Sequence, residues 1–570
     1  MKISFNDIAE NKRWSLLFLT VLGGLFFLGI GQTHLFDWDE INFAESAREM
    51  MQTGDYLRVQ VNYEPFWEKP PFFIWMQVAS MKLFGVNAFA ARFPNAIFGI
   101  LYLITIYLIG RKHFSPKLGL IWALVFCGSL LPNAYFKSGI IDPSFNFFIF
   151  LSVYFMIRVI SGLDEEKRGR LALLSGVFSG MSVITKGPVG FLLLGLTLFV
   201  YLVIKRFKPF PKIKYIFIFL GGLIGIILVW LTMEFSQNGF EIIRQFIAYQ
   251  AELFSSDVAG HQQPFYYHFV VVFFGCFPIS IIAIPHLLKK RSDTNLDFHM
   301  WMLCLFWGVL ILFSIVTTKI IHYSSMTWVP LSFVAAYSLY LIDLKKIALS
   351  RFVKWGYLVL GVLLSVALLA IAYFIANNYE FAEKITDPFV AASLRQDINL
   401  NPLGFAVGGI LLVGTFTGFI LLRKSKIGAF AITTAGSVMI ALLIACYTLL
   451  PAIEQFAQGP AIEFYERSER EGIKIVTFQY KSYGQYFYAK TEERREEMDW
   501  FLISDTDESL YLVAKQGNEW LSEKFKFELV ECKGGFCLYK RYAPKKICQG
   551  EKRNLLPIVI TVLEIIRIII

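Results

Sequence analysis

Long apolar segments recur along the chain, separated by short polar stretches. A helix needs about 20 mainly apolar residues to cross roughly 30 Å of hydrocarbon. By that length criterion the pattern predicts about thirteen membrane-spanning helices. They lie at residues 14–31, 88–110, 118–136, 143–161, 171–185, 188–204, 213–235, 267–287, 299–317, 327–344, 353–376, 403–422 and 427–450. The predicted fold class is therefore an all-α polytopic membrane protein.

Composition supports this fold class. Hydrophobic residues make up 56% and charged residues only 17% of the 570 positions, whereas about 25% of a typical soluble domain is charged. The formal charge of +10 would suit an acidic partner. Much of the excess lies in short loops, however, where membrane topology accounts for it. We therefore expect membrane lipids around this protein, and no nucleic acid.

Basic residues gather in alternate loops, which favours a cytoplasmic position for those loops. They lie at 2–13, 111–117, 167–170, 205–214, 289–291, 345–351 and 423–426. The first apolar run lacks a small-residue cleavage site, so we interpret it as a retained anchor. The pattern predicts a multi-pass protein of the cell membrane (the inner or plasma membrane). Its N-terminus would be cytoplasmic and its C-terminal region extracytoplasmic, together with the loops at 32–87, 137–142, 186–187, 236–266, 318–326 and 377–402.

The character of the chain changes after Pro451. Residues 1–455 form the predicted transmembrane domain, and residues 456–545 are charged and strand-rich. We expect strands near 473–479 and 500–504 and a hairpin over 527–539, which predicts a small extracytoplasmic α/β domain. Cys532 and Cys537 flank the hairpin turn and are candidates for a disulfide, with free thiols as the alternative because Cys548 leaves an odd count. The tail, 546–570, has no predicted role.

The first long outer loop, 32–87, is the most polar stretch of the first third of the chain. Residues 41–51 show a helical pattern, in which Ala44 and Ala47 supply an apolar edge while Glu45 and Glu49 face elsewhere. Prolines disfavour helical geometry at the preceding residue. Glu68-Lys69-Pro70-Pro71 should therefore be a rigid kink that fixes the direction of Glu68 and Lys69.

Ionisable and aromatic side chains collect on this same predicted side of the membrane, where charged groups usually face a polar cavity. Acids and lysines at the mouth of such a cavity suit transfer of a sugar from a lipid phosphate. A lysine would stabilise the departing phosphate. Lys69 is the best candidate, because the rigid kink fixes its direction. Asp39 would act as general base or stabilise the developing positive charge of the sugar. The other members are Glu40, Lys137, Asp142, Lys186, His261, Lys319, His322 and Tyr323.

Each member also has a simpler interpretation. The acids at 37–40 would cap a helix, as would Asp142 before Pro143, and Glu68 with Lys69 would be a solvated pair. Long cationic side chains can extend to lipid head groups; this interpretation applies to Lys186 and Lys319 and is the favoured one for Lys137. A single histidine such as His261 or His322 is more often a surface residue than a metal ligand. The cluster as a whole carries the functional hypothesis.

The motifs resemble those of the ArnT-like glycosyltransferases, GT-C fold enzymes related to the protein O-mannosyltransferases. The type member of that family moves 4-amino-4-deoxy-L-arabinose onto lipid A. The resemblance covers roughly residues 10–345. It rests on Asp39-Glu40 with the helix after it, Thr53-Gly-Asp, Phe66-Trp-Glu-Lys-Pro-Pro71, Phe89-Ala-Ala-Arg-Phe-Pro94, Ile141-Asp-Pro, Thr185-Lys-Gly-Pro and Thr318-Lys-Ile-Ile-His-Tyr323.

The resemblance implies roles for individual residues. Asp39 is similar to the catalytic carboxylate of the family's first loop, and Asp142 to the acidic residue of its second outer loop. Lys69 resembles the lysine that contacts the donor phosphate, and Tyr323 a donor-pocket tyrosine. Glu68 resembles a residue that helps to bind a divalent metal. The chain departs from the family's pattern at Tyr249-Gln-Ala-Glu252, so neither a metal site nor a role for His261 is implied there.

The sequence therefore predicts an integral-membrane glycosyltransferase that uses a polyprenyl-phosphate sugar donor. Lipid A, another envelope glycolipid, a polysaccharide or a protein would be the acceptor. No cofactor is predicted beyond a candidate divalent metal ion at Glu68. A transporter or flippase is the alternative, but such proteins place their binding groups near the midplane and between repeats, and no repeat is visible. The expected catalytic residues are Asp39, Asp142 and Glu40, and the expected donor-binding residues are Lys69, Lys186, Lys319, Tyr323 and Arg48.

Overall fold

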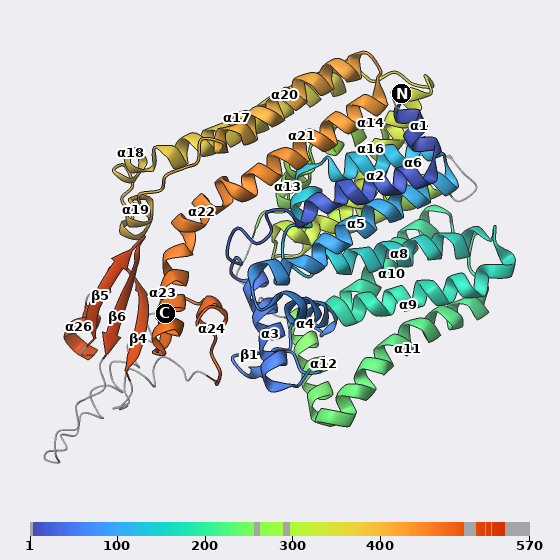
Figure 1. Ribbon diagram of the computed structural model, residues 1–570. Helices are drawn as coiled ribbons and strands as arrows, with labels where there is room; N and C mark the ends of the chain where they lie inside the picture. Colours follow the sequence, from blue (N-terminus) through green and yellow to red (C-terminus); the bar gives the residue numbers. More distant parts are fainter. Residues whose placement is uncertain are drawn as a thin grey trace, which may run out of the picture. The chain divides into compact units, whose positions relative to one another are not determined.

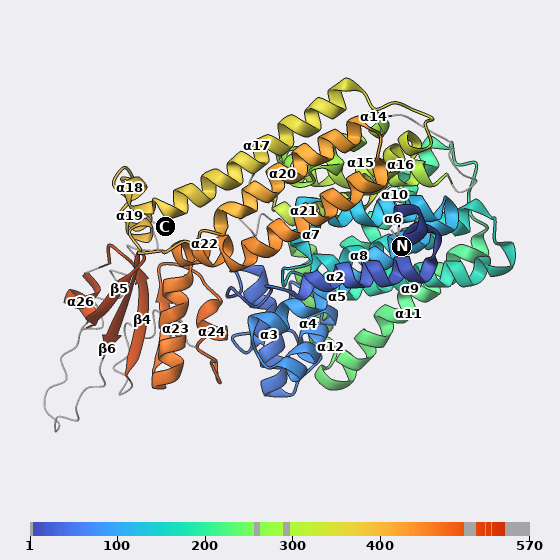
Figure 2. The same cartoon turned by 45° about the horizontal axis from the view of Figure 1, so that its top comes forward.

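A computed structural model describes residues 4–255, 263–288, 297–494, 509–518, 520–525 and 527–541. The chain divides into two compact units: residues up to 376 together with 399–453, and residues 377–398 together with those from 454 onward. The first unit is helical (Figures 1 and 2). His261, Cys548, the expected strand at 500–504 and the tail at 546–570 lie outside the described residues.

A helix or a pair of helices occupies each of the thirteen predicted spans. The helices are α2 (Lys12–Gly24), α5 (Ala88–His113), α6 (Pro116–Cys127), α7 (Leu130–Tyr135), α8 (Asp142–Ser161), α9 (Arg168–Lys186), α10 (Val189–Ile204), α11 (Ile213–Asn238), α13 (Tyr267–Gly275), α14 (Ile279–Leu287), α15 (Phe298–Ile315), α16 (Trp328–Asp343), α17 (Arg351–Ala376), α20 (Gly404–Arg423) and α21 (Ile427–Tyr447). A short helix α1 (Phe5–Glu10) precedes them.

The predicted number of spans is not confirmed. In the described part of the chain, eight helices are long and apolar enough to cross a membrane, or nine if the bent pair α13 and α14 counts as one span. Several others, such as α2 with 13 residues, are shorter than a full crossing. The span predicted at 267–287 is not one continuous helix, because the chain bends by 118° at the break between α13 and α14. Pro278 at the start of α14 lacks the backbone N–H needed to continue α13.

Residues 32–87, the predicted first outer loop, fold into helices and a hairpin at one end of the first unit. These are α3 (Asp39–Thr53), β1 (Gln60–Val61), β2 (Glu64–Pro65) and α4 (Phe72–Phe84), and α12 (Phe240–Ser255) lies beside them (Figures 1 and 2). The helix predicted over 41–51 is confirmed, and so is the non-helical tetrad before α4. The helix α4 was not predicted.

The expected orientation of two acids in α3 is wrong, because Glu45 and Glu49 are fully buried. Glu45 forms an ion pair of 2.7 Å with Arg48, and Glu49 accepts backbone N–H bonds of 2.7 Å and 2.9 Å from Asn62 and Tyr63. Burial, together with the neighbouring Glu45 carboxylate, raises the pKa of Glu49. The acids in α3 thus hold the following hairpin against the helix.

A second buried ion pair joins this loop to α5. The guanidinium of Arg92 pairs with Glu40 at 2.7 Å and donates hydrogen bonds to the carbonyl oxygens of residues 30, 33 and 34. Glu40 also accepts the backbone N–H groups of Phe36 and Gly139. One pair of side chains therefore fixes the turns that lead into α3 and the turn that precedes α8.

The second unit combines helices with a mixed four-stranded sheet of order β3-β4-β6-β5. Its helices are α18 (Asn378–Ala382), α19 (Pro388–Leu394), α23 (Gly459–Glu471), α24 (Gly484–Phe487) and α26 (Trp520–Phe525), with α22 (Leu449–Ala457) preceding α23 in the chain. The strands are β3 (Lys474–Phe478), β4 (Leu510–Lys515), β5 (Glu528–Lys533) and β6 (Phe536–Arg541).

Within this sheet β3 and β4 are parallel, whereas β6 is antiparallel to both β4 and β5. The predicted strand near 473–479 and the terminal hairpin are both confirmed. Of the two alternatives for the hairpin cysteines, the structure shows the Cys532–Cys537 disulfide. The extracytoplasmic position of this unit stays a prediction.

We expect Arg92→Met to destabilise the fold strongly, because it leaves the buried Glu40 carboxylate without its counter-charge. Removing one partner of a buried pair costs on the order of 3 kcal/mol or more. Thermal unfolding of the detergent-solubilised protein should show a large fall in midpoint. Arg244→Met is the control, since Arg244 pairs with Glu241 on an exposed helix face and its loss should leave the midpoint unchanged. Equal midpoints in the two variants would contradict the assignment.

Candidate active site

Four segments that are distant in sequence bring polar side chains together at one end of the first unit. Asp39 begins α3, Asp142 begins α8 and Lys186 ends α9. His322 and Tyr323 lie in a short 3₁₀ helix, η3 (Ile321–Thr327), between α15 and α16. Because each residue stands at a helix end or in a short turn, the helices behind it determine its position.

Acids and cationic groups alternate through this cluster. Nε2 of His322 lies 3.3 Å from Oδ2 of Asp39 and 3.8 Å from Oδ2 of Asp142. Nζ of Lys186 lies 2.6 Å from Oδ1 of Asp142. The Lys186 ammonium also stands 5.2 Å from the ring centroid of Tyr323, a geometry that stabilises a cation. The cluster is therefore a continuous chain of ionisable groups with Asp39 and Lys186 at its two ends.

A cavity opens beside this chain. Its empty space, including the open mouth, is about 820 Å³. Glu68, Lys69, Asp142 and Lys186 supply charged groups to its walls, and Lys69 pairs with Glu68 at 3.3 Å. The remaining lining residues are Phe145, Asn146, Pro188, Val189, Leu193, Phe313, Tyr323 and Met326. The cavity thus joins a charged end to an apolar wall.

The surroundings of Asp39 keep its carboxyl ionised. Burial opposes ionisation, but the hydrogen bond and charge of His322, with the charges of Lys69 and Lys186, lower its pKa to about 2. Because the pKa in the folded state lies below the ordinary value, the ionised group stabilises the folded protein at neutral pH. That contribution is lost as the pH falls through about 2.

The second acid, Asp142, is more deeply buried, with an exposed fraction of 3%. Its Oδ1 bonds to Lys186, while its Oδ2 has no hydrogen-bond partner among the described residues. One turn further along α8, Asn146 donates bonds of 2.7 Å to the hydroxyls of Tyr135 and Ser325. These bonds hold the first turn of α8 against η3, which carries His322.

Seven of the residues singled out from the sequence come together here: Asp39, Glu68, Lys69, Asp142, Lys186, His322 and Tyr323. Glu40 and Arg48 do not, since both are engaged in the buried pairs described above. Lys319 donates instead to the carbonyl oxygens of Gln263 and Thr317, at 2.8 Å and 3.4 Å.

Two further expectations are changed by the structure. Lys137 does not extend to lipid head groups, because its ammonium donates to the carbonyl oxygens of Leu25 and Leu28 at 3.0 Å and 2.7 Å. His322, a member of the predicted polar cluster for which a surface position was the simpler interpretation, links the two acids. The signal that identifies it is its place directly before Tyr323 in the motif that follows Lys319.

The structure offers no support for a metal at Glu68. Throughout the described ranges, no group of three or more His, Cys, Asp and Glu side chains is arranged to hold a metal ion, and Glu68 lies beside the ammonium of Lys69. We therefore derive no step through a metal ion.

Comparisons with known proteins agree with the motifs. Residues 68–232 match the family described as dolichyl-phosphate-mannose-protein mannosyltransferase. A protein of Aquifex aeolicus is 29% identical over 62% of this chain and 69% of its own length. An undecaprenyl phosphate-alpha-4-amino-4-deoxy-L-arabinose arabinosyl transferase of Wigglesworthia glossinidia brevipalpis is 26% identical over 60% of this chain and 61% of its own length.

The fold has a solved counterpart. The crystal structure of ArnT from Cupriavidus metallidurans bound to undecaprenyl phosphate superposes with a TM-score of 0.73, covering 95% of this chain and 99% of that one. The two sequences are 18% identical, so this likeness is one of fold.

We expect His322→Asn to raise the pKa of Asp39. Burial raises this pKa, and the variant lacks the histidine that lowers it. A water-soluble carbodiimide labels protonated carboxyl groups, and peptide mass spectrometry can follow labelling of Asp39 against pH. Labelling should begin at a higher pH in the variant than in the unmodified protein. His113→Asn, at a histidine that bonds to Tyr154 instead, serves as the control. The same onset of labelling in all three proteins would show that His322 does not set the pKa of Asp39.

Proposed function

Because this chain is an ArnT-like glycosyltransferase of the GT-C type, we propose that it transfers a sugar from a polyprenyl-phosphate donor to an envelope acceptor on the extracytoplasmic face. One observation carries the proposal. The cavity joins two lysine ammonium groups and two carboxylates to an apolar wall. That combination suits a reacting head group attached to a hydrocarbon chain.

The donor fits the cavity by its two chemical parts. The phosphate would lie between Lys69 and Lys186, and the first isoprenyl units would lie against apolar residues of α10 and α15 such as Leu193 and Phe313. A lysine near a phosphate acts as a point charge that stabilises negative charge. The relative of known structure binds undecaprenyl phosphate, which supports the same class of donor here.

In the proposed reaction, the bond between C1 of the sugar and the phosphate oxygen breaks while an acceptor oxygen forms a new bond to C1. The electron pair leaves with the phosphate, whose growing negative charge is stabilised by Lys186 and Lys69. Positive charge develops on the sugar ring, next to the Asp39 carboxylate. The two lysines and Asp39 thus stabilise opposite charges that separate in the transition state.

The low pKa of Asp39 affects which kind of acceptor group the site can use. A carboxylate with a pKa of about 2 is a weak proton acceptor, because a general base works best with a pKa near the working pH. An acceptor that is already an anion needs no base. We therefore favour a phosphate group, such as one on lipid A, over a hydroxyl group. The match to protein mannosyltransferases keeps a protein acceptor as the second candidate.

The remaining predicted site residues take positioning roles in this proposal. The ion pair of Glu40 with Arg92 fixes the backbone directly after Asp39. Arg48 pairs with Glu45 inside α3. Lys319 ties the entry of η3 to the chain before α13. None of these three groups lines the cavity.

Asp39→Asn should reduce transfer by about a hundredfold or more, because one preorganised charge at a reacting centre contributes roughly that factor. Purified protein, undecaprenyl-phosphate sugar and lipid A would be assayed by mass spectrometry. Asp343→Asn is the matched control, since Asp343 pairs with Lys117 and does not line the cavity. Both variants should still unfold cooperatively, which shows that each is folded. Normal turnover by Asp39→Asn would remove this residue from the reaction.

Lys186→Met should weaken binding of the donor phosphate. A ligand that binds the folded protein stabilises it, and the stabilisation increases with the affinity of the ligand. The rise in unfolding midpoint on adding undecaprenyl phosphate should therefore be smaller in the variant. Lys82→Met provides the comparison, because Lys82 is an exposed lysine at the end of α4. An unchanged rise in Lys186→Met would place the phosphate elsewhere.

A further inference from the structure

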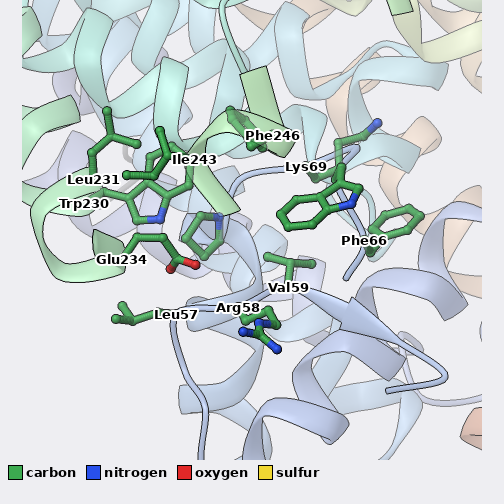
Figure 3. A pocket seen from close by; sticks show the side chains of 12 residues that line it. Leu57, Arg58, Val59, Phe66, Lys69, Trp230, Leu231, Glu234, Ile243 and Phe246 are labelled. Atoms are coloured by element: carbon green, nitrogen blue, oxygen red, sulfur yellow. The ribbon is translucent and has the colours of Figure 1, made fainter. Parts of the chain in front are cut away.

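A second cavity lies on the other side of the Glu68–Pro71 segment. Trp230 and Glu234 of α11 form one wall, Phe246 of α12 forms the next, and loop residues such as Arg58 and Trp67 complete it (Figure 3). The empty space between the walls, including the open mouth, is about 390 Å³.

Hydrogen bonds hold the walls of this cavity at a fixed separation. Nη2 of Arg58 donates to Oδ1 of Asn238 at 3.1 Å, and Nε2 of Gln237 donates to Oδ1 of Asp55 at 3.0 Å. Both bonds join the loop to the end of α11. The Phe246 ring stands edge-on to Trp230, at 5.3 Å between centroids. The opening is therefore a built feature of the outer loop and α11.

Three buried polar atoms at this cavity lack hydrogen-bond partners among the described residues. They are Oε2 of Glu234, Nε1 of Trp230 and Nε of Arg58; the last also lies 3.8 Å from Oδ2 of Asp55, an ion-pair contact longer than a hydrogen bond. Glu234 is only 3% exposed, and its carboxylate lies between α11 and the facing loop (Figure 3). Buried polar atoms are almost always hydrogen-bonded, so each one left over calls for an explanation. A bound ligand supplies one for all three together.

We propose that this cavity binds a neutral, hydroxyl-bearing sugar ring, contributed by the glycan of the acceptor. Hydroxyl groups both donate and accept, so a sugar can donate to Glu234 while accepting from Trp230 and Arg58. The aromatic side chains of Trp230, Trp67 and Phe246 offer apolar faces to the C–H side of the ring. The inference rests on the proposed function for its assignment to the acceptor.

Charged ligands fit the same atoms less well. An ammonium group could pair with Glu234 but has no lone pair for the N–H groups of Trp230 and Arg58, and the guanidinium would repel it. An anion could accept those two N–H groups but would face the Glu234 carboxylate. Only a group with donors and acceptors satisfies the three atoms at once.

The position of Lys69 connects this cavity to the active site. Lys69 lines both cavities. The aliphatic part of the Lys69 side chain forms part of the wall of the second cavity, and its ammonium group points away from that cavity (Figure 3). A ring held beside Trp230 would therefore lie next to the segment that faces the donor. This arrangement would present an acceptor to the donor from the opposite side of the kink.

Binding is tested by saturation-transfer NMR on the full-length protein in a detergent without sugars. Methyl β-D-glucopyranoside is the neutral probe, with glucosamine and glucose 1-phosphate as the cationic and anionic probes. We expect saturation of the ring C–H protons of the neutral probe and a loss of at least about fivefold in Trp230→Leu and in Glu234→Ala. Trp355→Leu, at an exposed tryptophan of α17, should leave the signal unchanged. Undecaprenyl phosphate should stabilise every variant equally, which shows that each is folded.

Assignment to the acceptor is tested by kinetics. Glu234→Ala should raise KM for the acceptor about tenfold, the effect of losing one hydrogen bond to a charged group, with kcat and the donor KM unchanged. Signals that persist in Trp230→Leu, or binding of glucosamine alone, would overturn the sugar site. An unchanged acceptor KM would overturn its assignment to the acceptor. If no transfer occurs at all, the proposed function fails while the NMR result still decides whether the site binds a sugar.

Discussion

The buried ion pair between Arg92 and Glu40 is the interaction on which the position of both acids depends. Burying two charges is costly unless their geometry is good and their remaining hydrogen-bonding groups are satisfied. Here the guanidinium also donates to three carbonyl oxygens, and Glu40 also accepts two backbone N–H groups. Glu40 is adjacent to Asp39, and Gly139 lies three residues before Asp142. The pair therefore determines the entry to α3 and to α8 together.

The charges of the site form a chain that explains its chemistry. Asp39, His322, Asp142 and Lys186 alternate between carboxylates and nitrogen groups, and each lies within 3.8 Å of the next. In the proposed reaction, a departing phosphate and a developing positive charge on a sugar ring would each meet a group of opposite sign there. The low pKa of Asp39 follows from the same arrangement, and it favours an acceptor that needs no base.

Sequence patterns were sufficient for the elements that depend on local rules. Helical periodicity predicts α3, prolines predict the kink before α4, and alternation predicts the hairpin of β5 and β6. Family motifs bring Asp39, Lys69, Asp142 and Lys186 into one hypothesis. The patterns did not reveal partners across the fold. Glu40 looks like a catalytic acid until Arg92 is seen beside it, and the motif that contains His322 does not show that this residue lies between two carboxylates. The bend between α13 and α14 was missed because hydropathy does not register a change of direction.

The most direct test compares the envelope lipids of cells that contain the protein with those of cells that lack it. Mass spectrometry would measure lipid A, other glycolipids and polyprenyl-phosphate sugars in both. The proposed function predicts that one envelope lipid, lipid A in the favoured case, carries an added sugar only when the protein is present. It also predicts that the corresponding polyprenyl-phosphate sugar accumulates when the protein is absent. Identical acceptor and donor pools in the two strains would contradict a glycosyl transfer by this protein.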